Sequence, residues 1–102
     1  MTALLEDRRQ AIEEACKRHG VRRLHAFGSA LRDDFSPGES DVDLLVEFEA
    51  MEAYARVDAY FGLLDALRSI FEREVDLVVS GAVKNQYIAR DIEQTKQMLY
   101  AA

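Results

Sequence analysis

The sequence predicts a single α+β domain in which helices flank a small β-sheet. The chain has 102 residues, which is the size of one domain with one hydrophobic core. Along the chain, apolar residues change between helical and strand spacing in the order α-β-α-β-α-β-α. No internal repeat, low-complexity segment or interdomain linker interrupts this order, so we expect residues 1–102 to form one domain.

The first half of the chain predicts a helix, a short strand and a loop. Apolar residues recur at helical spacing over 3–19, and a glycine ends the run. Residues 21–28 have the alternation of a strand, and a Gly-Ser pair then leads into a short helical turn. Residues 33–40 contain the only proline and are expected to form a loop.

The second half predicts two strands and two helices. The segment DVDLLVEF at 41–48 is the clearest strand in the sequence. Residues 52–71 carry an apolar stripe at helical spacing, and EVDLVV at 74–79 predicts a third strand. Apolar residues at helical spacing then predict a last helix over about 82–100. These helices are long enough to cover a small sheet.

Acidic residues are concentrated in one part of the chain. The formal net charge is −6, and residues 33–58 contain nine acidic residues against Arg56 alone. A nucleic-acid-binding protein usually has a basic face, so direct binding to nucleic acid is not expected. Most acid-rich loops are simply solvated. Asp41 and Asp43, however, lie inside an apolar strand pattern, which solvation does not explain.

The sequence indicates a cytoplasmic protein. An acidic residue by position 6 and the lack of a long apolar stretch argue against a signal peptide. No apolar run approaches the length of about 20 residues that crosses a membrane. The single cysteine, Cys16, excludes an internal disulfide and is compatible with a reducing compartment.

Asp41 and Asp43 are candidate metal ligands. Strand side chains alternate between faces, so these two carboxylates point the same way, with Cα atoms roughly 6–7 Å apart. Carboxylates on that spacing can converge on one Mg²⁺ or flank a pair of metal ions. From this pair alone, a metal site and a solvent-facing polar edge both remain open.

Asp76 is the candidate third acid. It lies in the middle of a β-branched strand, where an aspartate is unfavourable by propensity. An edge strand with its polar face in water is the alternative, and Glu74 on the same face supports it. A neighbouring strand with one more carboxylate would complete a three-acid cluster, which suits Mg²⁺ and substrate phosphates. No Cys/His cluster is present, so a zinc site is not expected.

Gly28-Ser29 is a candidate phosphate-binding turn. Glycine permits a close approach of the backbone, and Ser29 at a helix start could donate its hydroxyl and N–H groups to a phosphate. Arg32 could reach a triphosphate or form a surface ion pair with Asp33 or Asp34. A lone Gly-Ser pair is a weak signal, but one followed by an arginine, a loop and a two-acid strand is much less common.

In combination, these motifs resemble the minimal nucleotidyltransferase (MNT) family of the DNA polymerase β-like superfamily. Its pattern is Gly-Ser, eleven residues, Asp-x-Asp and a later third acid, and the match covers essentially the whole chain. The resemblance implies a small mixed sheet of about three strands flanked by helices. The family's acids, expected to hold two Mg²⁺ ions, correspond to Asp41, Asp43 and Asp76. Its triphosphate-binding turn corresponds to Gly28 and Ser29, and an arginine common after that turn corresponds to Arg32.

The resemblance also implies a function. Prokaryotic members are often encoded beside a HEPN-domain ribonuclease toxin and act as its antitoxin, some by adenylylating it. We therefore expect transfer of AMP from ATP to a hydroxyl of a HEPN toxin, in a hetero-oligomer with that toxin. Two alternatives stay open: a non-catalytic antitoxin that masks the toxin, and nucleotidyl transfer to RNA or a small molecule. A homodimer of the chain alone is also compatible with the sequence.

Several other residues have simpler expected roles. His25 is expected to be a packing or edge residue of its strand. Tyr54 and Phe61 fit the apolar stripe of their helix, with a partner surface as the alternative. Lys84 and Tyr87 follow the third strand closely and could line a nucleotide pocket.

Overall fold

The computed structural model describes residues 6–28, 42–81 and 85–102. In chain order, the elements are α2 (Arg9–Arg18), β1 (Val21–Phe27), β2 (Val42–Phe48), α3 (Ala53–Phe71), β3 (Val75–Val79), α4 (Gln86–Thr95) and β4 (Gln97–Ala101). The strands form one sheet in the order β3-β2-β1-β4. β1 is antiparallel to both β2 and β4, whereas β2 and β3 are parallel. The expected α+β class, with a mixed sheet flanked by helices, is confirmed.

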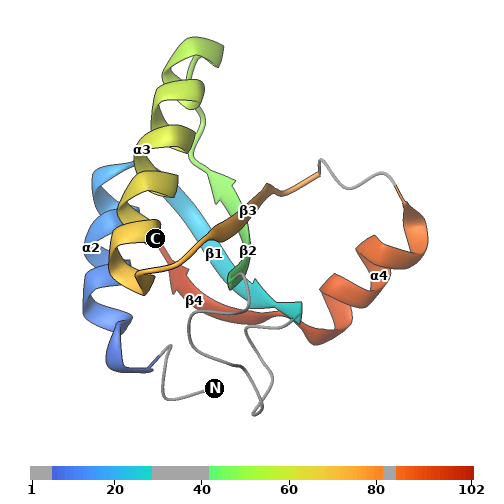
Figure 1. Ribbon diagram of the computed structural model, residues 1–102. Helices are drawn as coiled ribbons and strands as arrows, with labels where there is room; N and C mark the ends of the chain where they lie inside the picture. The colour runs from blue at the N-terminus through green and yellow to red at the C-terminus, as the bar shows by residue number, and fades with distance from the viewer. Residues whose placement is uncertain (1–5, 29–41, 82–84) are drawn as a thin grey trace.

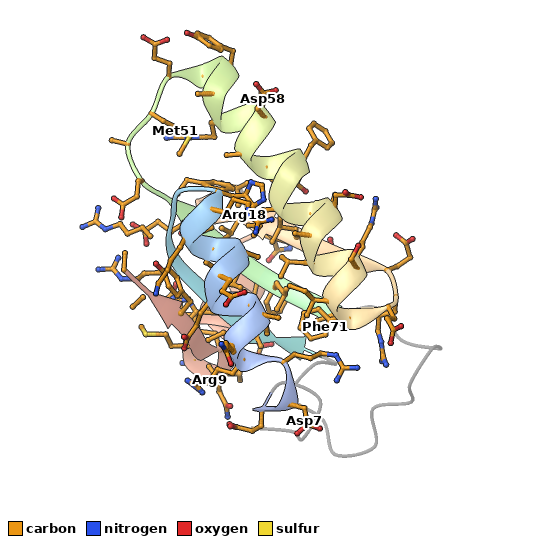
Figure 2. The ribbon with its side chains drawn as sticks, turned by 90° about the vertical axis from the view of Figure 1, so that its left-hand side faces the viewer. Asp7, Arg9, Arg18, Met51, Asp58 and Phe71 are labelled. Carbon is orange, nitrogen blue, oxygen red and sulfur yellow. The ribbon has the colours of Figure 1, made fainter. Side chains whose placement is uncertain are left out.

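Helices α2 and α3 cover one face of the sheet, and α4 stands on its other side (Figure 1). α2 and α3 lie side by side, and the main hydrophobic core fills the space between them and the sheet (Figure 2). Burying each large apolar side chain there stabilises the fold by roughly 1.5–3 kcal/mol. The fully buried members of this core include Ile12, Cys16, Leu24, Leu44, Leu63, Leu67 and Phe71.

The two faces of β2 differ in character. Val42, Leu44 and Val46 are completely buried on the face that meets the core. Asp43 and Glu47 are half-buried at alternate positions, so they lie on the opposite side of the strand. We call this second side, away from α2 and α3, the open face of the sheet.

Helix α3 connects the two parallel strands. The expected helix over 52–71 is confirmed. It ends at Glu72, which has a left-handed conformation (φ 56°) and whose N–H donates to the Arg68 carbonyl at 2.8 Å. The first turns of α3 extend beyond α2, as both views show (Figures 1 and 2). Tyr54 and Phe61 are therefore 72% and 61% exposed, and the expected apolar stripe belongs to the core only in its C-terminal half.

The helix predicted over about 82–100 is confirmed up to Thr95 within the described residues, and the prediction is wrong beyond it. α4 ends at Thr95, and the following residues form β4 alongside β1, so the sheet has four strands instead of about three. Leu99 is 4% exposed and Met98 48% exposed, as strand alternation requires. Pairing with β4 satisfies the backbone groups along an edge of β1 that would otherwise be open. This long-range pairing outweighs the helical spacing of the local sequence.

Among the described residues, no helix combines the length and the apolar character that crossing a membrane requires.

Candidate active site

Asp43 and Asp76 lie side by side on the open face. They are register partners in the parallel pair β2–β3, and adjacent strands are about 4.8 Å apart. Their strand neighbours Val42 and Val75 are buried on the opposite face, at 0% and 6% exposed, and anchor both strands in the core. Asp43 is half-buried and Asp76 is exposed. The sheet thus brings together two carboxylates that are 33 residues apart in the sequence.

Gly28 lies directly against the Asp43 carboxylate. It follows β1, whose last residue, Phe27, is the register partner of Asp43. Its φ is +58°, in the left-handed region that favours glycine. A Cβ built on Gly28 would lie 2.7 Å from Oδ2 of Asp43, which is too close for any side chain to fit without moving the carboxylate. The glycine of the predicted phosphate-binding turn and one predicted metal ligand therefore lie in direct contact.

Half of the predicted site residues can be located. Gly28, Asp43 and Asp76 converge at one end of the open face. The other three predicted site residues lie outside the described residues: Ser29, Arg32 and Asp41. Lys84 lies outside them as well, and Tyr87 is 84% exposed at the start of α4.

The donor chemistry of this end of the sheet fits Mg²⁺. Two carboxylates from neighbouring strands are hard oxygen ligands, and Mg²⁺ typically takes one or two carboxylates together with water and substrate phosphates. Because Gly28 has no Cβ, the Asp43 carboxylate can lie directly against the backbone of this turn. Within residues 6–28, 42–81 and 85–102, no three His, Cys, Asp or Glu side chains are grouped to hold a metal ion.

A cluster of charged residues surrounds His25 farther along the open face. Arg23 bonds Glu47 across the β1–β2 pair at 2.9 Å, and Lys96 bonds Glu93 at 2.9 Å. His25 itself is 9% exposed and faces Leu45 in the register. Burial, helped by the nearby charge of Lys96, lowers the pKa of His25 below its ordinary value of 6.5. The imidazole is therefore neutral at pH 7.

The sequence did not reveal this cluster. The sequence does indicate one part of it: strand alternation places His25 on the same face as Phe27, and this is the face on which Asp43 lies. Lys96 and Met98 reach the same place only because β4 pairs with β1. Since the segment that contains them has helical spacing, their approach to His25 could not be foreseen.

A family model described as "Nucleotidyltransferase domain" matches residues 8–99 of the chain. A protein of Methanocaldococcus jannaschii, to which protein adenylyltransferase activity is attributed, is 35% identical over 89% of this chain and 86% of its own length. The protein adenylyltransferase MntA of Thermococcus cleftensis is 33% identical over 72% of this chain and 70% of its own length.

Solved structures share the fold. A chain assigned as a minimal nucleotidyltransferase has a TM-score of 0.73 and 29% identity, over 91% of this chain and 90% of that chain. A complex of a tri-AMPylated HEPN toxin with an MNT antitoxin from Shewanella oneidensis gives a TM-score of 0.62 at 18% identity, over 96% of this chain and 73% of that chain. A toxin–antitoxin complex with AMP-PNP gives a TM-score of 0.64 at 18% identity, over 92% of this chain and 73% of that chain. At 18% identity, the likeness shows the fold alone.

Proposed function

The chain belongs to the nucleotidyltransferase domain family, and on that basis we propose that it is a protein adenylyltransferase antitoxin that modifies a HEPN-domain toxin. The two relatives at 35% and 33% identity support the class of reaction. The tri-AMPylated HEPN toxin in one of the matched complexes supports the acceptor. AMP-PNP in another supports ATP as the donor.

One observation carries the proposal for this chain: Asp43 and Asp76 are register partners on the open face, next to the tight approach of Gly28. A strand pair that held these acids only as a polar edge would not require a backbone glycine against one of them. A site that binds phosphates through the backbone of a turn and metal ions through a carboxylate does require it, because the two must lie close together.

In the proposed site, Asp41, Asp43 and Asp76 would hold Mg²⁺. Bound Mg²⁺ supplies positive charge that stabilises the charge developing on the phosphates and lowers the pKa of the acceptor hydroxyl. The Gly28-Ser29 turn would bind the outer phosphates through backbone N–H groups and the Ser29 hydroxyl. Arg32 would add positive charge to the same turn.

The proposed reaction is an in-line displacement. The acceptor oxygen forms a bond to the α-phosphorus of ATP, and the bond from that phosphorus to the oxygen shared with the β-phosphate breaks. Pyrophosphate leaves, and Asp76 would orient the acceptor hydroxyl and take its proton. Asp76 is exposed, so a hydroxyl on another protein can approach it from solvent. Positioning and electrostatic stabilisation would provide most of the rate, as in other phosphoryl transfers.

The test uses ATP labelled at its α-phosphate and measures transfer of labelled AMP to the purified HEPN toxin in the presence of Mg²⁺. We expect Asp43→Asn and Asp76→Asn each to reduce labelling on the order of 100-fold, since each removes a charge from the reacting centre. Glu14→Gln is the matched control, because Glu14 is exposed on α2, which covers the face of the sheet opposite the aspartates. Labelling by Asp43→Asn at the wild-type rate would refute the proposal.

Neutralisation of the toxin should be measured with the same variants. If Asp43→Asn still binds the toxin but no longer protects cells, neutralisation depends on transfer. If it protects as well as the wild type, the chain neutralises the toxin by masking it, and the catalytic role in neutralisation is refuted.

A further inference from the structure

The first half of α3 exposes three large apolar side chains on one side of the helix. Tyr54, Val57 and Phe61 are each more than half exposed. Their spacing of three and then four residues places them in a single stripe along the helix. The core side of α3 is made by other residues, such as Leu63 and Leu67, which are completely buried. We call the three exposed residues the α3 patch.

The exposed Phe61 ring is supported by a fixed neighbour. Tyr60 donates its hydroxyl to the Leu77 carbonyl at 2.7 Å, and this bond ties its side chain to β3. The Tyr60 ring meets the Phe61 ring edge to face, with centroids 5.3 Å apart and ring planes at 90°. A side chain that is already ordered loses little conformational freedom when a partner covers it. Such aromatic side chains often carry much of the binding energy of a protein interface.

Acidic side chains border the α3 patch. Asp58 lies four residues after Tyr54 and three before Phe61, so it is next to both on the helix surface. It is exposed on the part of α3 that extends beyond α2 (Figure 2). Asp65, also exposed, lies four residues after Phe61. Within the described residues, no basic side chain forms an ion pair with either carboxylate.

The two arginines of α3 do not cancel this negative charge. Arg68 lies seven residues after Phe61 on the same side of the helix, but its guanidinium is paired with Glu74 at 3.2 Å. Arg56 lies two residues after Tyr54, and that spacing turns its side chain away from the patch. The surface therefore has an apolar centre and an acidic rim formed by Asp58 and Asp65.

The charge of the rim decides between two kinds of occupant. A second copy of the chain would bring the same acidic rim against itself, because a two-fold axis pairs identical surfaces. Like charges that meet in an interface oppose binding, and the net charge of −6 on each copy adds to the repulsion. A different protein, with an apolar pocket bordered by basic residues, would gain both apolar burial and charge complementarity.

We propose that the α3 patch and its acidic rim are the docking surface for the toxin, which meets them with an apolar pocket bordered by basic residues. The inference rests on the proposed function, which supplies the toxin as the partner. β2 runs from Asp43 to Phe48, roughly 16–17 Å, and α3 begins beyond that end of the strand. The docked toxin therefore leaves the aspartates uncovered, and binding and transfer use different surfaces.

The experiment measures binding of the full chain to the purified toxin by calorimetry, and AMP transfer at increasing toxin concentration. Tyr54→Gln and Phe61→Gln should each weaken binding about tenfold or more. The KM for the toxin should rise to match, with kcat and the KM for ATP unchanged. Both side chains are exposed, so neither change disturbs the core. Lys17→Gln, on the exposed side of α2, is the control and should alter none of these values.

The rim is tested by Asp58→Asn combined with Asp65→Asn. This double variant should weaken toxin binding several-fold at low ionic strength and reduce the dependence of affinity on salt, because the rim attracts through its charge. Phe61→Gln should instead weaken binding by the same factor at low and high salt.

Unchanged toxin affinity in Phe61→Gln would overturn the docking surface and leave the proposed function intact. A lower kcat at an unchanged KM for the toxin would overturn it too. If Phe61→Gln binds the toxin normally but converts a dimer of the free chain into a monomer in sedimentation, the patch binds a second copy and the proposal is wrong. A wild-type chain that neither binds nor labels the toxin would overturn the proposed function, and the docking surface with it.

Discussion

At the scale of single residues, the contact between Gly28 and Asp43 links a backbone conformation to the position of a carboxylate. The sequence predicted that both residues belong to the site, because strand alternation and the Gly-Ser turn are local features. It could not predict that they touch. The contact depends on the register of β1 against β2, and the 13 residues 29–41 separate Gly28 from β2.

Gly28→Ala should therefore impair the site more than the fold. The new methyl group must displace Oδ2 of Asp43, and a non-glycine residue at φ +58° costs about 1 kcal/mol of stability. We expect AMP transfer to fall at least tenfold, measured with α-labelled ATP. Gly20→Ala is the control: its φ is +68°, but its Cβ would meet only the flexible end of Met51. Equal activity losses in the two variants would show that backbone strain, rather than the carboxylate, explains the effect.

His25 gives the protein a stability that depends on pH. Its folded-state pKa lies below the ordinary value of 6.5, as does that of His19, because burial disfavours the charged imidazole. Below pH 6.5 the unfolded chain then binds more protons than the folded chain, so the free energy of unfolding falls as the pH falls. The midpoint of thermal unfolding should drop between pH 7.5 and 5.5. His25→Gln should reduce that drop, and a parallel decline in both proteins would contradict the assignment.

At the scale of elements, the strands and helices with a strong local pattern were predicted well. β2, α3 and β3 agree with the expected segments to within one residue at each end, apart from residues outside the described ranges. β4 was missed because its residues continue the helical spacing of α4, and only the open edge of β1 decides between helix and strand. The charged cluster around His25 was missed for the same reason, since β4 completes it.

The strand assignment of β4 predicts opposite behaviour for adjacent residues. Leu99 is 4% exposed in the main core, and Met98 is 48% exposed on the other side of the strand. Leu99→Ala should lower the free energy of unfolding by about 2–4 kcal/mol, and Met98→Ala by less than about 1 kcal/mol. Urea denaturation of the two variants measures the difference. Similar losses in both would mean that this segment does not alternate as a strand.

At the scale of the whole molecule, Cys16 reports on the opening of the core. It is a residue of α2 and is completely buried in the core between this helix, α3 and the sheet, and burial raises the pKa of its thiol to about 12. Only the thiolate reacts with disulfide reagents, so the folded protein should be labelled very slowly. Cys16 is the only cysteine, and the labelling rate therefore follows one site.

That thiol can test whether the nucleotide site and the core form one cooperative unit. If labelling requires global unfolding, Mg²⁺ and ATP must slow it in proportion to the stabilisation they give, which is a factor of about 100 at 100 times the dissociation constant. Asp43→Asn should abolish the slowing without speeding the reaction in the absence of nucleotide. Ile12→Ala should speed labelling in the absence of nucleotide and keep the slowing by Mg²⁺ and ATP, because Ile12 lies in the core and away from the open face. If saturating Mg²⁺ and ATP leave the labelling rate of the wild type unchanged, Cys16 becomes accessible through a local opening around α2, and the core and the site are not thermodynamically coupled.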